Sequence, residues 1–180
     1  MSTAMPSPGP RAWRFHPWLW IAAAALLLVP AVAMMLGVPG VAWDTFDFVV
    51  MGALLAAACA LVEVGVRAGT GALYRAAFAL AVLTGFLIVW VNLAVGMLGN
   101  EGHPANLMFG GVLAVAAAGA LLARFRAPGM ALAMAAAGVA QLAAAGAALA
   151  MGGFETRELV LTACFALPWF ASAALFARSS

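Results

Sequence analysis

The stretch NLAVGMLGNEGHPANLMF, Asn92 to Phe109, decides how the rest of the chain is organised. It is the only segment in which Asn, Glu, His, Pro and repeated Gly gather between two long apolar runs. The runs on either side are as long as a membrane-spanning helix, which needs about 20 apolar residues. We therefore interpret the centre of this stretch as a polar loop that joins two such helices.

The composition excludes an ordinary soluble domain. Of 180 residues, 67% are hydrophobic and only 8% are charged, whereas soluble domains carry roughly 25% charged residues. The fold class predicted is an all-α, polytopic membrane protein: a single domain at 18–178 of about six transmembrane helices with short loops. A Pro-rich disordered lead at 1–17 precedes it. The predicted spans are 18–37, 45–66, 74–98, 106–123, 130–151 and 157–177.

The first span has two interpretations. Ala31-Val32-Ala33 resembles a signal-peptidase site after a short apolar core. The apolar run continues through Met34 to Leu36, which favours a retained first span over a cleaved signal peptide. The rest of the topology is the same in both cases.

The arginines predict the orientation. All eight basic residues are Arg. With the N-terminus in the cytoplasm, seven of the eight lie inside and only Arg157 lies outside, as the positive-inside rule for short loops requires. Both termini are then cytoplasmic. The abundance of Ala and Arg is typical of a high-GC bacterial genome, so we expect a multi-pass protein of the bacterial inner membrane.

Acidic residues fall at the outer starts of predicted spans. Asp44 and Asp47 have the spacing of a helix capping pair, and Glu155 and Glu158 lie at the start of the last span. Carboxylates at helix N-termini are favoured by the helix dipole. The alternative is an outward-facing site for a cation or proton, because several carboxylates on one face concentrate cations.

Glu63 and Arg67 form the one acid–base pair at the inner side. They are spaced i,i+4, at which opposite charges meet on one helix face. An ionisable residue within a span is a functional candidate by default. Because Glu63 lies about one turn from the predicted membrane edge, we interpret the two residues as a structural pair.

Asn92 and Gln141 are amides within spans three and five. Both spans run in the same direction, and from the predicted outer ends the two depths differ by about 6 Å. Buried amides in membranes usually bond to a neighbouring helix. A polar lining for a substrate path is the alternative, which would make Asn92 and Gln141 part of a candidate polar site.

The loop itself supplies the remaining candidates. Pro104 suits an early helical position, and Asn106 can cap the fourth span. His103 is able to titrate near neutral pH, but Glu101 is its only acidic neighbour, so no metal site is predicted. The sequence contains no haem, phosphate-loop or hydrolase motif. No cofactor, catalytic residue or nucleic-acid partner is therefore predicted.

Two further expectations concern packing. Cys59 and Cys164 are interpreted as buried small residues at different depths, too far apart for a disulfide. Small residues recur every fourth position in two spans, and such stripes let helices approach closely. We expect them to pack within the bundle rather than against a second copy. The stripes are Gly52, Ala56 and Ala60, and Gly110, Ala114 and Ala118.

Two segments resemble a group of small, uncharacterised bacterial inner-membrane proteins. The shared features are the DF-x-x-x-G opening at Asp47–Gly52, an acid near the end of that span, and an outer loop that ends in Pro104-Ala105-Asn106. The resemblance covers spans two to four and implies a compact membrane bundle. It implies no activity, ligand or site residue.

The function expected from these features is a non-enzymatic accessory or assembly subunit of the membrane. Its partners would be the lipid bilayer and another membrane protein or a second copy of this chain. The main alternative is a small transporter or channel that uses the candidate polar site. A third alternative is a membrane-embedded enzyme acting on a lipid or quinone. The candidate polar site consists of Asn92, Gln141, Asp44, Asp47, Glu101, His103 and Asn106.

Overall fold

The computed structural model describes residues 16–69 and 71–179, and every regular element in these ranges is a helix. Six helices in the described ranges are long and apolar enough to cross a membrane, which confirms the predicted fold at that level. The elements are α1 (Pro17–Met35), α2 (Thr45–Ala68), α3 (Ala72–Ala94), a 3₁₀ turn η1 (Pro104–Asn106), α4 (Leu107–Leu122), α5 (Ala127–Met151), α6 (Thr156–Cys164) and α7 (Ala166–Arg178).

The predicted lead at 1–17 falls mostly outside the described residues. The description begins at His16, and Pro17 is already the first residue of α1. The arginines Arg11 and Arg14, which contribute to the predicted orientation, also lie outside the described residues.

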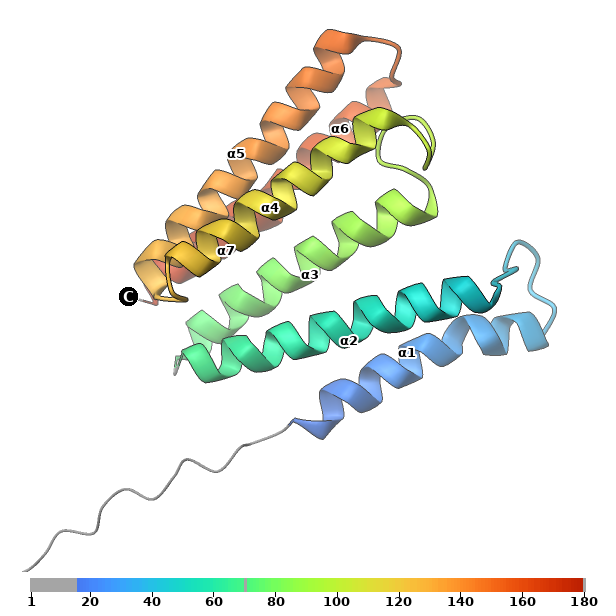
Figure 1. Ribbon diagram of the computed structural model, residues 1–180, viewed down its shortest axis with the longest axis horizontal. Helices are drawn as coiled ribbons and strands as arrows, with labels where there is room; N and C mark the ends of the chain where they lie inside the picture. Colours follow the sequence, from blue (N-terminus) through green and yellow to red (C-terminus); the bar gives the residue numbers. More distant parts are fainter. Residues whose placement is uncertain (1–15, 70, 180) are drawn as a thin grey trace, which may run out of the picture.

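Successive long helices alternate in direction, so the charged residues separate to two ends of the bundle (Figure 1). We name the two ends by these residues. The arginine end carries Arg67, Arg75, Arg124, Arg126 and Arg178, and the acidic end carries Asp44, Asp47, Glu101, Glu155 and Glu158.

Helices that are consecutive in the chain are not always neighbours in space. Helix α7 packs against both α3 and α5, and α5 packs against α4, so α3 and α4 meet only slightly. Helix α2 packs against α3, and α1 packs against α2 at the edge of the bundle (Figure 1). The centre is therefore formed by α5 and α7, while no residue of α1 is buried.

Small residues explain why α5 occupies the centre. In lipid, helices associate through close packing rather than through the hydrophobic effect, and Gly and Ala allow their backbones to approach. A Cβ atom at Gly119 of α4 would lie 2.6 Å from the Cβ of Ala133 in α5. A Cβ at Gly138 of α5 would lie 2.8 Å from the ring of Phe170 in α7. Larger residues at these glycines would separate the helices.

An aromatic cluster closes the bundle at the arginine end. The rings of Tyr74 and Phe176 pack edge to face with centroids 5.1 Å apart, and Phe78 contacts Phe125 and Phe176. The Tyr74 hydroxyl donates to the carbonyl of Phe125 at 2.6 Å. Arg124 and Phe125 have positive φ angles of 48° and 58°, a conformation unfavourable for L-residues. The hydroxyl and the packed ring hold this tight turn between α4 and α5.

Helix α3 ends four residues earlier than the predicted boundary at 98. The N–H groups of Val95 and Gly96 both donate to the carbonyl of Val91, and Gly96 has a φ of 75°. The helix thus ends at a residue in the left-handed conformation, which glycine adopts without steric cost. A Cβ there would collide with the carbonyl of Asn100. The apolar residues Met97 and Leu98 are buried in the loop instead of extending the helix.

The sixth span is two helices rather than one. Helix α6 ends at Cys164, and α7 begins at Ala166, two residues before Pro168. Proline lacks an N–H and its ring clashes with the carbonyl four residues earlier, here that of Cys164. The interruption therefore follows from Pro168.

Two packing predictions are wrong in part. Cys59 is buried, but Cys164 is exposed on the outside of the bundle where α6 ends. The stripe of Gly110, Ala114 and Ala118 is exposed as well, because α4 turns a different face towards α5. A Cβ added at Gly110 would meet no atom within 4 Å. That stripe does not pack within the described chain.

Candidate functional site

Two pairs of carboxylates at the acidic end begin helices. The Asp47 N–H donates to the Asp44 carboxylate at 2.9 Å, and the Asp44 N–H donates to the Asp47 carboxylate at 2.9 Å. This is a reciprocal capping box at the start of α2, as the spacing predicts. The Glu155 N–H likewise donates to the carboxylate of Glu158 at 3.3 Å at the start of α6. Each pair satisfies backbone donors within its own helix.

Asn106 closes the loop between α3 and α4. Its side-chain oxygen accepts from the N–H groups of Met97 and Leu98 at 3.2 and 3.0 Å. Its amide nitrogen donates to the carbonyls of Leu98 and Asn100 at 3.2 and 2.7 Å. The expectation that this side chain caps α4 is wrong, because all of these bonds go back to residues 97–100.

His103 and Glu101 do not form a joint site. The Nδ1 atom of His103 accepts from the N–H of Ala105 at 3.2 Å, and its ring lies edge to face on Phe154 with centroids 5.1 Å apart. Glu101 is exposed. Within residues 16–69 and 71–179, no three His, Cys, Asp or Glu side chains come close enough to hold a metal ion.

Gln141 bonds to the interrupted sixth span. It is completely buried, and its Nε2 donates to the carbonyl of Thr162 at 2.9 Å. The last four carbonyls of a helix lack intrahelical partners, and Thr162 lies in the last turn of α6. Gln141 of α5 therefore bonds to a backbone carbonyl in the last turn of α6, just before the chain is interrupted at Phe165. Its own Oε1 has no hydrogen-bond partner in the described part of the chain.

Asn92 lies apart from Gln141. Its Nδ2 donates to the carbonyl of Ile88 at 2.8 Å, one turn back in the same helix. Because α3 ends at Ala94, Asn92 is two residues from the helix end and Gln141 is ten from its own. The described residues contain no hydrogen bond between the two amides.

A small hollow opens at the acidic end between α3 and α6. Its volume is about 330 Å³, and Arg157, Glu158 and Thr162 contribute its polar lining. The Thr162 hydroxyl donates to the carbonyl of Met97 at 3.4 Å across this region. Arg157 and Glu158 thus lie near the Thr162–Gln141 contact at this hollow.

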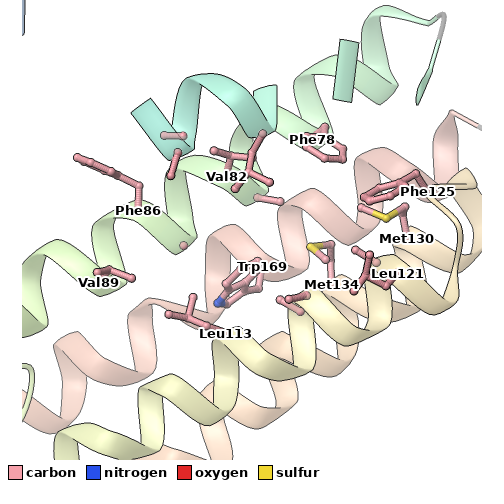
Figure 2. A pocket seen from close by; sticks show the side chains of 18 of the residues that line it. Phe78, Val82, Phe86, Val89, Leu113, Leu121, Phe125, Met130, Met134 and Trp169 are labelled. Atoms are coloured by element: carbon pink, nitrogen blue, oxygen red, sulfur yellow. The ribbon is translucent and has the colours of Figure 1, made fainter. Parts of the chain in front are cut away.

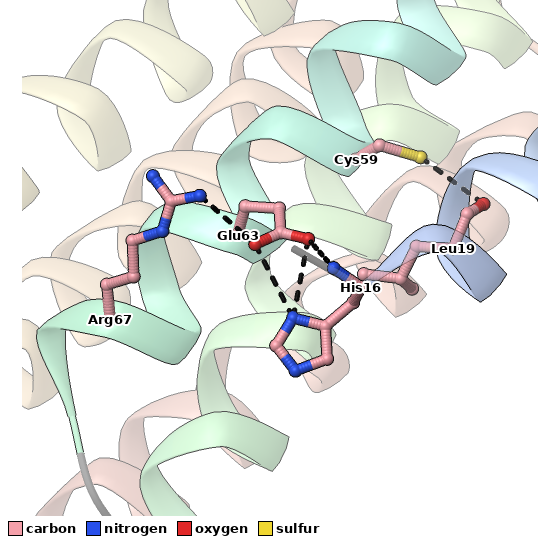
Figure 3. Close-up of polar contacts among 5 residues, drawn as sticks. All are labelled: His16, Leu19, Cys59, Glu63 and Arg67. Carbon is pink, nitrogen blue, oxygen red and sulfur yellow. Dashed lines mark hydrogen bonds and ion pairs between the residues drawn. The ribbon is translucent and has the colours of Figure 1, made fainter. Parts of the chain in front are cut away.

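Glu63 is the most connected ionisable residue of the described chain (Figure 3). It is 4% exposed. Arg67 pairs with its carboxylate at 3.3 Å, which confirms the predicted i,i+4 contact. Its second partner is not indicated by any local sequence pattern: the His16 N–H donates to Glu63 Oε1 at 2.8 Å, and the His16 ring lies 3.3 Å from the same oxygen.

This contact joins α1 to α2. His16 is the residue before α1, where backbone N–H groups lack intrahelical acceptors and negative charge is favoured. One helical turn earlier in α2, the Cys59 thiol donates to the carbonyl of Leu19 at 3.6 Å. Figure 3 shows both contacts on the side of α2 that faces α1. Glu63 thus has a structural role as a cap for a neighbouring helix.

A second cavity is apolar and lies where α3 and α4 separate (Figure 2). Its volume is about 490 Å³. Helices α2, α3, α4, α5 and α7 all contribute to its lining, and every lining residue is Ala, Gly, Val, Leu, Met, Phe or Trp. The only side-chain polar group in this lining is the indole N–H of Trp169. No residue of this cavity belongs to the predicted polar site.

Comparison with known proteins places the chain in no family. No family model, curated protein or solved structure matches it. The site must therefore be interpreted from its own chemistry. The seven candidate polar residues do not converge. Two begin α2, Asn106 and His103 bond within the loop, Asn92 and Gln141 bond to backbone carbonyls, and Glu101 is exposed.

Proposed function

We propose that this chain is a multi-pass protein of the bacterial inner membrane and a non-enzymatic accessory or assembly subunit. Its N- and C-termini are on the cytoplasmic side. Six long apolar helices support insertion into a membrane. The seven-to-one distribution of the arginines supports the orientation.

One observation carries the accessory role: the exposed stripe of Gly110, Ala114 and Ala118 on α4. Small residues in membrane helices mark places where another helix backbone approaches closely, and this stripe has no such neighbour within the described chain. A transmembrane helix of a partner protein fits that surface. The polar side chains support the same role, because their bonds maintain the bundle itself.

The test is native mass spectrometry of the tagged protein, extracted gently from its own membrane. We expect a partner at fixed stoichiometry. Gly110→Leu should reduce the yield of that partner at least about tenfold, because the new side chain separates the helix backbones. It should leave the fold intact, since a Cβ at Gly110 meets open space.

Gly146→Leu is the matched control. Gly146 also lies on an exposed helix surface with no atom within 4 Å of an added Cβ, but it belongs to α5. The control should retain the partner. Equal retention by both variants, or a bare monomer from the native membrane, would refute the accessory role.

A small transporter or channel is the second candidate, and the hollow at the acidic end is the observation that favours it. Arg157 and Glu158 lie at its surface, and Thr162 connects it to Gln141. The acceptor oxygens of Asn92 and Gln141 are buried without partners in the described chain. In proteoliposomes, Asn92→Leu should then abolish solute flux while the thermal unfolding midpoint stays unchanged. A variant that loses stability and keeps its flux would exclude Asn92 from a transport path.

A further inference from the structure

The apolar cavity has the form of a trough that opens sideways from the bundle. Residues of α3 and α7 form its floor, and α5 closes it towards the arginine end through Met130 and Met134. Its exposed lining residues mark the mouth, and they lie on two walls that are far apart in sequence. They are Ala57 and Leu61 on α2, and Ala117 and Leu121 on α4. In a membrane this mouth faces the hydrocarbon of the lipids.

Trp169 supplies an unpartnered donor to the trough. The residue is 2% exposed, and its Nε1 has no hydrogen-bond partner among residues 16–69 and 71–179. Buried tryptophan N–H groups usually find an acceptor, and leaving one without costs stability. Figure 2 shows the indole nitrogen directed towards the space between Val89 and Leu113, both of which line the trough. The arrangement suits a ligand that brings one acceptor.

The depth of Trp169 restricts the class of ligand. It lies nine residues before Arg178, the end of α7, which is about 13 Å along the helix axis. The hydrocarbon core of a bilayer is about 30 Å thick, so the indole lies near its middle. The ester carbonyls of a phospholipid are tied to its headgroup at the edge of that core. An acceptor at this depth belongs to a neutral molecule that dissolves wholly in the hydrocarbon.

The lining indicates a flat ring. Phe78, Phe86, Phe125 and Trp169 contribute aromatic surfaces, which stack on planar rings. The volume of about 490 Å³ lies within the range of small-molecule sites, about 300–1,000 Å³. A ring carbonyl provides the acceptor, and an alkyl or prenyl tail provides the apolar body that leaves through the mouth.

We propose that the trough binds a neutral, lipid-soluble quinone, whose ring carbonyl accepts a hydrogen bond from Trp169 Nε1. The tail passes between α2 and α4 into the lipid. The site is a binding site without a redox step. This inference rests on the membrane insertion of the proposed function, but it does not depend on a partner subunit.

The test is equilibrium binding of a radiolabelled benzoquinone with a ten-carbon alkyl chain to the full-length protein in detergent micelles. We expect saturable binding at one site. Trp169→Phe keeps the aromatic ring and removes the donor, so it should weaken binding by about twofold to tenfold. Trp18→Phe, at an exposed position of α1, should leave binding unchanged.

Two neighbouring variants test the mouth. Ala117 and Val115 are both exposed on α4, but only Ala117 lines the trough. Ala117→Phe should reduce binding more than about tenfold, because the ring fills the entrance. Val115→Phe should bind as the unchanged protein does. Their exposure lets both variants fold, and the unfolding midpoint of each checks this.

Competition identifies the ligand chemistry. An alkylbenzene with the same tail has no carbonyl and should compete with the labelled quinone at least about twofold less well than unlabelled quinone does. If the alkylbenzene competes equally and Trp169→Phe has no effect on binding, the role of the indole is overturned. Equal displacement by phosphatidylglycerol would overturn the assignment to a neutral ring. Absence of saturable binding, or equal binding by the Ala117 and Val115 variants, would overturn the site. Recovery of the protein outside the membrane fraction would instead refute the proposed function.

Discussion

Replacing Glu63 should loosen α1 from the rest of the bundle. The bond from the His16 N–H to this carboxylate is 2.8 Å long and joins two helices. A hydrogen bond to a charged group contributes about 1.5–3 kcal/mol, against about 0.5–1.5 kcal/mol for a neutral one. Arg67, whose side chain is 46% exposed, adds no more than about 0.5 kcal/mol. Glu63→Gln should therefore cost about 1.4 kcal/mol and Glu63→Ala about 3 kcal/mol.

Cys59 provides the assay. Its thiol is buried where α2 meets α1 and bonds to the Leu19 carbonyl, so it reacts with N-ethylmaleimide when α1 separates. The rate of labelling follows the population of the open state. We expect labelling about tenfold faster in Glu63→Gln and roughly 100-fold faster in Glu63→Ala. Cys164 is exposed and free, and serves as the reference thiol in the same molecule.

Asp47→Asn is the matched control, since it removes a carboxylate from the opposite end of the same helix. It should leave the labelling of Cys59 unchanged. If Glu63→Ala labels no faster than Asp47→Asn, the carboxylate does not hold α1 in place and the reasoning is refuted.

Two further predictions concern the turns that join the helices. Tyr74→Phe removes the bond to the Phe125 carbonyl and should lower the free energy of unfolding by about 1 kcal/mol; an unchanged denaturation midpoint in detergent would show that the turn needs no such support. Gly96→Ala places a side chain at a φ of 75° and should lower the free energy of unfolding by about 1–2 kcal/mol or more. Gly110→Ala, at a position where an added Cβ meets open space, should not lower it. Equal midpoints for the two alanine variants would contradict the conformational argument.

Length and hydropathy predict the six long helices well, because each apolar run between turn residues has the length of a span. They predict helix ends less well. The run continues past Ala94 through Val95, Met97 and Leu98, so hydropathy alone does not show that α3 ends there. Gly96 is the only local signal, and glycine is also common inside membrane helices. The predicted end of this span therefore lies four residues beyond the observed end of α3.

Helix neighbours and inner faces are harder to predict than spans. A helix that is apolar all round carries no stripe that separates core from lipid, and α4 is of this kind, so the orientation of Gly110 could not be inferred. The i,i+4 pair of Glu63 and Arg67 is local and predictable. Its contact with His16, 47 residues away, depends on how α1 packs. The trough is likewise invisible in the sequence, because its walls belong to α2 and α4.

The placement of α7 between α3 and α5 has a consequence for biogenesis. During synthesis from the N-terminus, the first five spans enter the membrane before the sixth, whose helix α7 packs against both α3 and α5. Until then the Gln141 amide lacks the Thr162 carbonyl, and the Ala77 carbonyl of α3 lacks the Ser172 hydroxyl that donates to it at 2.8 Å in the finished bundle. Small residues of α5 face lipid for the same interval. The nascent protein is therefore most vulnerable to membrane quality-control proteases until α7 has inserted, and a variant that lacks α7 should be degraded rather than accumulate.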